Sequence, residues 1–326
     1  MATVQKIYEE MQRMAPLELA ESWDNPGLLV DCGGEVSRVL VALDVTAETL
    51  AEAEQNGCQL IVTHHPVIFH PLKKLSPADL PFQLVQKGIS AICMHTNLDA
   101  AEGGVNEVLA GIFGMKNWEP FAGGCGRVGE VEPITVPELA RKARVELGAR
   151  CNTPLDGPEV PVKYADTGKP VRRLAVISGA GGGLFEEALA MEADCLLTGE
   201  ADHHDALDAK RLGLSIVAAS HYATEFPVAA AVAQSSAPRS RLWKCWSARP
   251  TATRLLIYNK FIIKKTSQSR YRSPAAPLSA LACHLPGRGS LSCQGALGKE
   301  ISFSLGNGSD CQSLSCQERC HRAKRR

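Results

Sequence analysis

Histidine and carboxylate side chains that follow apolar, strand-like runs are the residues of this sequence most able to do chemistry. The run 59–63 leads directly into His64 and His65, and two later runs each close on a histidine, three residues and a carboxylate. In α/β proteins, binding and catalytic groups collect at the carboxyl ends of the strands. The candidate metal ligands chosen by this placement are His64, His65, Asp99, His221 and Glu225, with His95, Glu200, His203 and His204 close by in the pocket.

These candidate ligands combine imidazoles with carboxylates and include no thiolate. Such ligands suit a divalent Zn, Mn, Fe, Co or Ni ion in a hydrolytic or redox-active site, whereas structural zinc sites usually contain cysteine. One ion rarely needs five such ligands while it keeps an open position. Two ions about 3.5–4 Å apart, bridged by a carboxylate, would use all five and leave places for a water. We therefore expect two divalent metal ions per subunit.

Plainer interpretations of individual residues stay open from the sequence. The adjacent pair 64–65 alone is compatible with two loop histidines, and the pair 203–204 could cap or pack a helix that follows a strand. Trp23 and Asp24 precede an Asn-Pro-Gly turn, and we place them at the mouth of the predicted site. What decides between these interpretations is whether matching ligands occur at the ends of other strands.

A repeat is the strongest internal signal in the chain. Segment 38–65 aligns without a gap with segment 173–200, at an offset of 135 residues, and both read as strand, acidic helix and strand. Segments 88–99 and 213–225 each begin Gly-apolar-Ser and end in the His-x-x-x-acid pattern. Repeated units of this kind predict an α/β fold in which two similar β-α-β-containing lobes, with mixed or parallel sheets, face each other across a pseudo-twofold cleft. A chance match between generic α/β units is the alternative.

The predicted elements and the composition divide the chain into three parts. Residues 1–125 are expected to form the first lobe, residues 126–234 the second lobe, and residues 235–326 a tail. The glycine-rich run 123–131 lacks the Lys-Ser/Thr ending of a phosphate-binding loop, so we interpret it as a tight turn that enters an edge strand.

Composition indicates a protein that can bury a sizeable core and has no membrane segment. The chain has 326 residues, 45% of them hydrophobic, and a net charge of zero. Its 12 cysteines divide evenly between residues 1–234 and the rest, and those of the first part lie singly in apolar runs or at loop edges, which is typical of a reducing compartment. The N-terminal residues mix charged with apolar side chains and show no signal-peptide pattern. We therefore predict a cytoplasmic protein.

Four motifs, in this order, resemble a known family: THHPVIF, HTNLDAAEGGVNEVLA, TGEADHHDALDA and HYATE. They are similar to the dinuclear-metal proteins called GTP cyclohydrolase I type 2 homologues, or Nif-three-like proteins, over about residues 1–234. The resemblance implies a two-lobed α/β fold, a toroidal homohexamer and a metal pair that faces the interior of the ring. It also implies that the five candidate ligands bind this pair, with Glu225 as the bridge.

The activity implied by this resemblance is a metal-dependent hydrolase that acts on a small molecule, either a nucleotide or a phosphoester. No guanine-reading pocket and no triphosphate clamp can be recognised in the sequence, and basic residues near the motifs are sparse apart from Lys73 and Lys74. A non-catalytic metal-binding scaffold or regulatory protein is therefore the alternative.

The tail, residues 235–326, departs from the family pattern, in which a final strand completes the second sheet. It holds 17 Lys and Arg but only 3 Asp and Glu, a composition typical of disorder. A shift of reading frame near residue 234 is the favoured interpretation, and it would leave the second lobe without its closing strand. A basic tail that binds nucleic acid is one alternative. A zinc module is another, with Cys283, Cys293, Cys311, Cys316, Cys320 and His321 as ligands.

Overall fold

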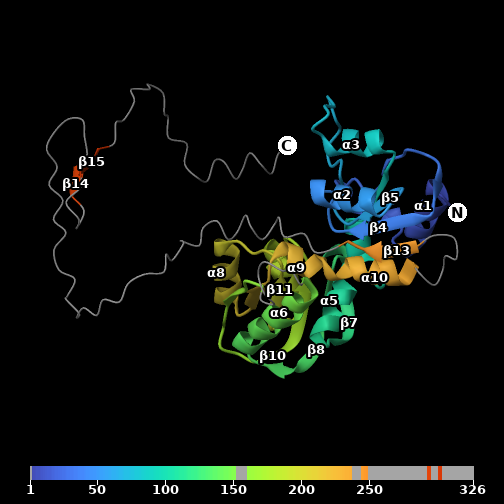
Figure 1. Ribbon diagram of the computed structural model, residues 1–326. Coiled ribbons are helices and arrows are strands. Elements are labelled where there is room, and N and C mark those ends of the chain that lie inside the picture. The colour runs from blue at the N-terminus through green and yellow to red at the C-terminus, as the bar shows by residue number, and fades with distance from the viewer. Residues whose placement is uncertain (1, 152–159, 237–243, 249–291, 295–299, 303–326) are drawn as a thin grey trace. The chain divides into compact units, whose positions relative to one another are not determined.

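The computed structural model describes residues 2–151, 160–236, 244–248, 292–294 and 300–302, and the chain divides into two compact units, Met1–Ile263 and Lys264–Arg326 (Figure 1). In the second unit, strand β14 (Ser292–Gln294) pairs antiparallel with β15 (Glu300–Ser302). Cys293 belongs to β14, while the other ligands of the predicted zinc module lie outside the described residues. The disorder and nucleic-acid binding predicted for the tail also fall mainly on residues outside these ranges.

The first sheet holds five strands in the order β13-β4-β5-β6-β2. Strands β13, β4, β5 and β6 run parallel, and β2 pairs antiparallel with β6. Alternate residues of β4 face opposite sides: Val39 and Val41 pack in one buried cluster, Leu40 and Ala42 in another. Both faces are therefore covered, as a parallel sheet requires. The strands are β2 (Gly27–Val30), β4 (Arg38–Ala42), β5 (Leu60–Thr63), β6 (Ser90–Cys93) and β13 (Lys244–Ser247).

Helices from distant parts of the sequence cover the two faces of this sheet. One face carries residues of α1 (Val4–Met14), α5 (Val105–Phe113) and α10 (Pro227–Ser236), and the other carries α2 (Ala47–Gln55) and α3 (Leu80–Lys87). The short strands β1 (Ala2–Thr3) and β3 (Glu35–Val36) pair beside the first face. No helix in the described ranges is both long enough and apolar enough to cross a membrane.

The second sheet holds six strands in the order β7-β8-β10-β11-β12-β9. Its inner strands β10, β11 and β12 run parallel, and the flanking strands β8 and β9 are antiparallel to them. The strands are β7 (Lys116–Phe121), β8 (Gly126–Ile134), β9 (Lys163–Ala165), β10 (Val171–Ile177), β11 (Cys195–Thr198) and β12 (Ser215–Ala218). The glycine-rich run 123–131 therefore enters β8 between β7 and β10, so the prediction that it enters an edge strand is wrong, because β7 covers that edge.

One face of this sheet, where Leu174 and Val176 of β10 pack, is covered by α5, α6 (Val136–Cys151) and α9 (His221–Glu225). The other face, where Ala175 and Ile177 pack, is covered by α7 (Phe185–Ala190) and α8 (His203–Leu212), beside the 3-10 turns Ala122–Gly124 and Gly182–Leu184. Helix α4 (Thr96–Ala100) instead packs Leu98 in a buried cluster of the first sheet and contacts the 3-10 turn Leu17–Leu19.

The strand register confirms the repeat that the sequence indicates. Val39 of β4 pairs with Leu60 of β5, and the residues 135 positions later, Leu174 and Cys195, pair in the same way between β10 and β11. The predicted α/β class with mixed and parallel sheets is confirmed. The division at residue 125 stays a prediction, because residues 1–263 form one compact unit.

The segment after the second sheet returns to the first sheet. Helix α10 contributes Val228, Ala229 and Val232 to the buried cluster of the first sheet, and β13 pairs parallel with β4 (Figure 1). The disorder predicted for the tail, residues 235–326, therefore does not hold at residues 244–247. The absence of a closing strand from the second lobe stays a prediction. Composition missed β13 because a four-residue strand depends on the open edge of β4, far away in the sequence.

Candidate metal centre

His64 and His65 follow strand β5 directly, and each ring is held by its Nδ1 atom. Nδ1 of His64 lies 2.9 Å from the carbonyl oxygen of Met94, and Nδ1 of His65 lies 2.8 Å from Oδ1 of Asp44. A carbonyl oxygen and a carboxylate accept hydrogen bonds, so the proton belongs on Nδ1 in both rings. Each histidine therefore keeps Nε2 as the free ligand atom, the arrangement usual for metal-binding imidazoles.

His95 is held in the same way, by a carboxylate from the turn before β2. Its Nδ1 lies 2.7 Å from Oδ1 of Asp24, and Oδ2 of Asp24 accepts hydrogen bonds from the backbone N–H and the hydroxyl of Thr96. Burial alone would raise the pKa of Asp24, but the hydrogen bonds from His95 and Thr96 lower it to about 2. Asp24 therefore stays ionised beneath His95, and its side chain is fully buried rather than lining the mouth as predicted.

The two His-x-x-x-acid patterns each span one helical turn. Asp99 lies on α4, whose N-cap is His95, and α9 begins at His221 and ends at Glu225. Residues four positions apart share a helix face. Nε2 of His221 accordingly lies 3.0 Å from Oε1 of Glu225.

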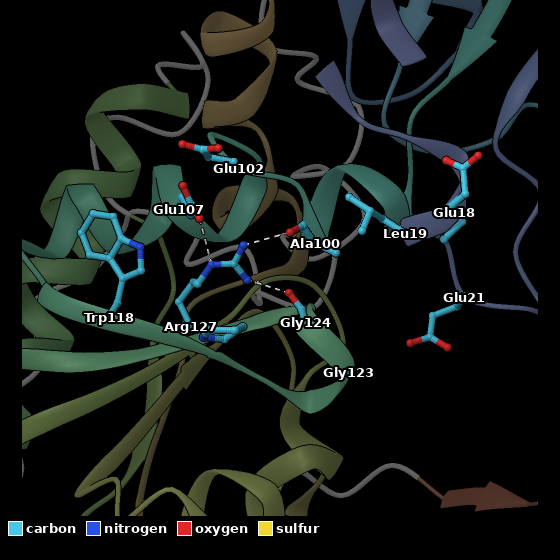
Figure 2. Close-up of a pocket in the computed structure, with 12 residues that line it drawn as sticks. Glu18, Leu19, Glu21, Ala100, Glu102, Glu107, Trp118, Gly123, Gly124 and Arg127 are labelled. Carbon is cyan, nitrogen blue, oxygen red and sulfur yellow. Dashed lines mark hydrogen bonds and ion pairs between the residues drawn. The ribbon is translucent and has the colours of Figure 1, made fainter. Parts of the chain in front are cut away.

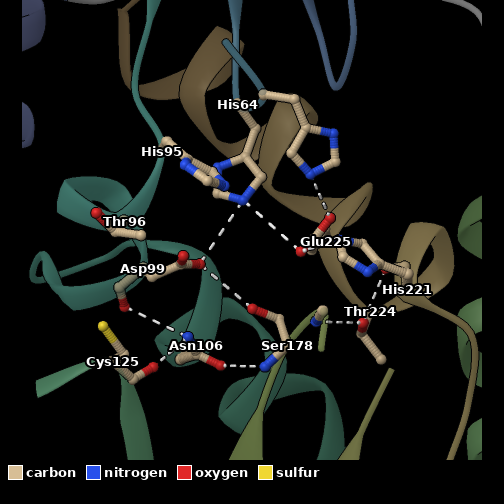
Figure 3. A network of polar contacts seen from close by, with 12 residues as sticks. His64, His95, Thr96, Asp99, Asn106, Cys125, Ser178, His221, Thr224 and Glu225 are labelled. Carbon is tan, nitrogen blue, oxygen red and sulfur yellow. Dashed lines mark hydrogen bonds and ion pairs between the residues drawn. The ribbon is translucent and has the colours of Figure 1, made fainter. Parts of the chain in front are cut away.

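Glu225 lies at the centre of the candidate site, between histidines from both halves of the repeat (Figure 3). Its Oε2 lies 3.1 Å from Nε2 of His65, and its Oε1 lies 3.8 Å from Nε2 of His64. Asp99 approaches from the other side, with Oδ1 at 3.7 Å from Nε2 of His64. All five predicted ligands are therefore brought together.

Two groups of three residues in the described ranges place their ligand atoms within 4.8 Å of one another: His64, His65 and His95, and His65, His221 and Glu225. His65 belongs to both groups. His95, which the sequence placed among the pocket residues, lies with the candidate ligands His64 and His65. Asp99 belongs to neither group.

The remaining pocket predictions lie at the edge of this site. Oε2 of Glu200 is 3.5 Å from Nδ1 of His221, and the Glu200 side chain is half exposed. His203 and His204 are exposed at the start of α8, where their rings contact each other. None of these three residues belongs to the two groups of ligand atoms found among the described residues.

The side chains present fit a bound metal. Nε2 of His64 is buried and has no hydrogen-bond partner among the described residues. Buried polar atoms are nearly always paired, because an unpaired one costs about 1–3 kcal/mol. An imidazole nitrogen without a partner, beside the buried carboxylate of Glu225, matches the ligands of a divalent transition metal.

The ionisation of these residues shows how strongly they interact. Burial would raise the pKa of Glu225, but hydrogen bonds from His221 and His65 hold it well below its usual range. Burial, together with the charge of Glu225, raises the pKa of Asp99 well above its usual range. Burial would lower the pKa of His65, but its contacts with Asp44 and Glu225 raise it to about 10. A metal ion at Nε2 of His65 would therefore replace a proton.

Asp99 is supported by a hydrogen-bonded chain that sequence reasoning missed. The hydroxyl of Ser178 donates to Oδ1 of Asp99 at 3.3 Å, and the backbone N–H of Ser178 donates to Oδ1 of Asn106 at 2.8 Å (Figure 3). The amide of Asn106 donates in turn to the carbonyl oxygens of Asp99 and Cys125. Asp44 was also missed, although it follows the run 38–43 and the strand-end criterion could have identified it.

Two residues with positive φ lie beside Glu225 or His221, one in space and one in the sequence. Gly179 has φ +63°, and a Cβ atom there would lie 2.3 Å from Oε1 of Glu225. Ser220, directly before His221, has φ 73°, a conformation that non-glycine residues adopt rarely. Such strained positions concentrate at functional sites.

A separate acidic cavity of about 570 Å³ lies beside the end of α4 (Figure 2). The guanidinium of Arg127 fills one wall, where it pairs with Glu107 and donates to the carbonyl oxygens of Ala100 and Gly124. None of the candidate ligands lines this cavity. Arg127 thus anchors the helix turn that carries Asp99.

Comparisons with known proteins agree with this fold. A family described as Duf34/NIF3 (NGG1p interacting factor 3) matches residues 2–240. A Helicobacter pylori protein named GTP cyclohydrolase 1 type 2 is 35% identical over 239 residues, which are 72% of this chain and 91% of that protein. NGG1-interacting factor 3 of Saccharomyces cerevisiae is 30% identical over 263 residues, which cover 69% of this chain and 86% of that protein.

A solved structure shows the same fold. The crystal structure of Staphylococcus aureus protein SA1388 superposes with a TM-score of 0.67 and 26% identity, over 76% of this chain and 96% of that one. The family match ends at residue 240, before β13, so the chain beyond that residue lies outside it. With a family match over most of the chain and relatives at 30–35% identity, the chain belongs to the Duf34/NIF3 family.

Proposed function

We propose that this protein is a metal-dependent hydrolase whose dinuclear centre acts on a nucleotide or another phosphoester. The observation that carries the proposal is the buried Glu225 between His64, His65 and His221, with Nε2 of His64 buried and without a hydrogen-bond partner among the described residues. The name of the Helicobacter pylori relative, GTP cyclohydrolase 1 type 2, supports a nucleotide as substrate.

The contacts support a division of ligands between two ions. His65, His221 and Glu225 would hold one ion, since their ligand atoms already lie within 4.8 Å of one another. His64 and Asp99 would hold the other, with Glu225 bridging both, because Nε2 of His64 lies 3.7 Å from Asp99 and 3.8 Å from Glu225. When bound, divalent ions supply Lewis acidity and activate water for attack.

His95 is the residue best placed to move a proton. Asp24 holds its Nδ1, its ring lies 5.2 Å from that of His64 and 5.7 Å from that of His65, and its side chain is 17% exposed. A positioned imidazole of this kind can serve as general acid or base. His95 would give or take the proton of the reacting group, while the buried Glu225 orients the histidines around it.

Measuring bound metal in the purified full chain after reconstitution with Mn, Fe or Zn tests the metal centre. We expect two equivalents per subunit, and His65→Ala should lose at least one because His65 belongs to both ligand groups. His95→Ala should keep both ions if His95 moves a proton and lose one if it is a ligand. Less than one equivalent in the wild-type protein, unchanged by His65→Ala, would sink the proposal.

Turnover is tested with a panel of nucleotides and phosphoesters added to the metal-loaded protein. We expect hydrolysis by the wild-type protein and none by Glu225→Ala. Equal product formation by both proteins would exclude catalysis at this site.

A non-catalytic metal-binding scaffold is the second candidate. The name of the yeast relative, NGG1-interacting factor 3, favours it. Two bound ions without turnover on any substrate of the panel would support this candidate over the hydrolase. Assembly into a toroidal homohexamer stays a prediction from the family resemblance, and light scattering of the full chain tests it.

A further inference from the structure

Three aromatic rings meet beside the candidate metal centre. Trp23, Phe69 and His95 have ring centroids 6.1–6.4 Å apart, and both outer rings meet His95 edge to face. Trp23 is 60% exposed and Phe69 is 39% exposed. Large rings at such exposure keep part of their surface open to a ligand.

The two exposed rings are held in place by polar contacts between their segments. The side-chain amide of Asn25 donates to the carbonyl oxygen of Ile68 at 2.7 Å, which ties the turn of Trp23 to the loop of Phe69. Asp24, the neighbour of Trp23, holds His95 and Thr96. The aromatic pair is thus organised around the same histidine that contacts His64 and His65.

We propose that Trp23 and Phe69 form a stacking subsite for the nucleobase of the substrate. The assignment rests on the proposed function for the reacting group, which would lie at His64, His65 and Glu225. A base stacked on these rings would lie one ring contact away from His95, close enough for an attached group to reach the metal ligands. Indole and phenyl faces carry no charge, and stacking accepts any base because every base has a π face.

A second copy of this chain is the competing occupant, because Leu72 and Leu75 are also exposed on the loop of Phe69. A stable interface needs about 800 Å² from each partner, far more than two rings supply. The rings also contact His95 beside the candidate metal centre, which a contact between copies does not require. We therefore favour the small ligand, and the test distinguishes the two.

The experiment is calorimetric titration of the metal-loaded full chain with guanosine and adenosine, with ribose as the control ligand. Nucleosides carry no phosphate, so the basic tail contributes no charge-driven binding. We expect similar affinities for both nucleosides and none for ribose. Trp23→Ala and Phe69→Ala should each weaken nucleoside binding about tenfold, while Trp23→Phe keeps most of it because a ring remains.

Trp118→Ala is the matched control, since Trp118 is 39% exposed on β7 and lines the other cavity (Figure 2). It should bind nucleosides like the wild-type protein. Equal affinity of Trp23→Ala and wild type, or equal losses in Trp23→Ala and Trp118→Ala, would overturn the subsite. If Trp23→Ala and Phe69→Ala form smaller assemblies in light scattering while their nucleoside binding is unchanged, the rings contact a second copy of the chain instead.

Metal content and turnover, measured on the same samples, separate this subsite from the proposed function. Nucleoside binding that depends on Trp23, without turnover on the substrate panel, would support the subsite and contradict the hydrolase activity. Turnover of nucleotides with unchanged KM in Trp23→Ala would support the hydrolase activity and contradict the subsite.

Discussion

Positions 44 and 179 are equivalent under the offset of 135 residues, yet the first half of the repeat has a carboxylate there and the second half a glycine. Asp44 holds the ring of His65, whereas Gly179 makes room for Glu225. His65 and Glu200 occupy another pair of equivalent positions and also differ. The two halves thus have similar scaffolds and differ in the residues at their strand ends.

The two halves also differ in how firmly they hold their histidines. In the first half, Nδ1 of His64, His65 and His95 each lies within 2.9 Å of a buried or partly buried oxygen. In the second half, Nδ1 of His221 lies 3.5 Å from the half-exposed Glu200. We infer that the first half presents preorganised ligands and that the second half supplies the bridging carboxylate.

The largest effect is expected from Gly179→Ala, which removes the room that Gly179 leaves for Glu225. The new Cβ would lie 2.3 Å from Oε1 of Glu225, at φ +63°, so Glu225 must move and the backbone is strained. We expect loss of both metal ions and a destabilisation of about 1–3 kcal/mol. Metal analysis and denaturant unfolding measure the two effects.

Gly183→Ala is the control for this substitution, because a Cβ at Gly183 would meet only Oδ2 of Asp205, at 3.8 Å. It should retain both ions and nearly all stability. Two retained ions in Gly179→Ala would show that Glu225 can coordinate from another position, which would contradict the close fit.

The next largest effect is expected from Asp44→Asn, which keeps a hydrogen-bonding group beside His65 but removes its charge. Carboxylates that orient a ligand histidine typically contribute 10–100-fold in metal affinity, so we expect a loss of about that size. Competition with a chromogenic chelator measures it. Asp31→Asn removes the same charge from an exposed residue and should leave the affinity unchanged; equal losses in both variants would indicate only a general charge effect.

Ser178→Ala tests whether the second half supports a ligand of the first half. The substitution removes the hydroxyl that donates to Oδ1 of Asp99, a contact of about 1 kcal/mol. We expect one ion to bind about five- to tenfold more weakly, while the ion at His65, His221 and Glu225 is unaffected. Ser37→Ala, which removes a hydroxyl contact with Gln59 at the opposite end of β5 from His64, is the control. Equal weakening of both ions would contradict separate sites.

Local patterns in the sequence predicted the scaffold and the residues that meet at the candidate site, because both follow short-range rules. Continuous apolar runs identified β4 and β5, and the offset of 135 residues matched them with β10 and β11. The five predicted ligands meet because the carboxyl ends of strands from both sheets converge there. Local rules could not predict Asp24 beneath His95, or the chain from Asn106 through Ser178 to Asp99. These contacts join residues more than 70 positions apart.

The smallest effect is expected from Glu200→Gln, the equivalent of a change at His65 in the other half. Glu200 is half exposed and lies 3.5 Å from Nδ1 of His221, and exposed ion pairs contribute about 0–1 kcal/mol. We expect metal affinity to fall by less than about fivefold, well below the loss in Asp44→Asn. Chelator competition on both variants, in one buffer, makes the comparison direct. A loss in Glu200→Gln as large as that in Asp44→Asn would show that both halves hold their histidines equally firmly, and the asymmetry inferred from the contacts would be wrong.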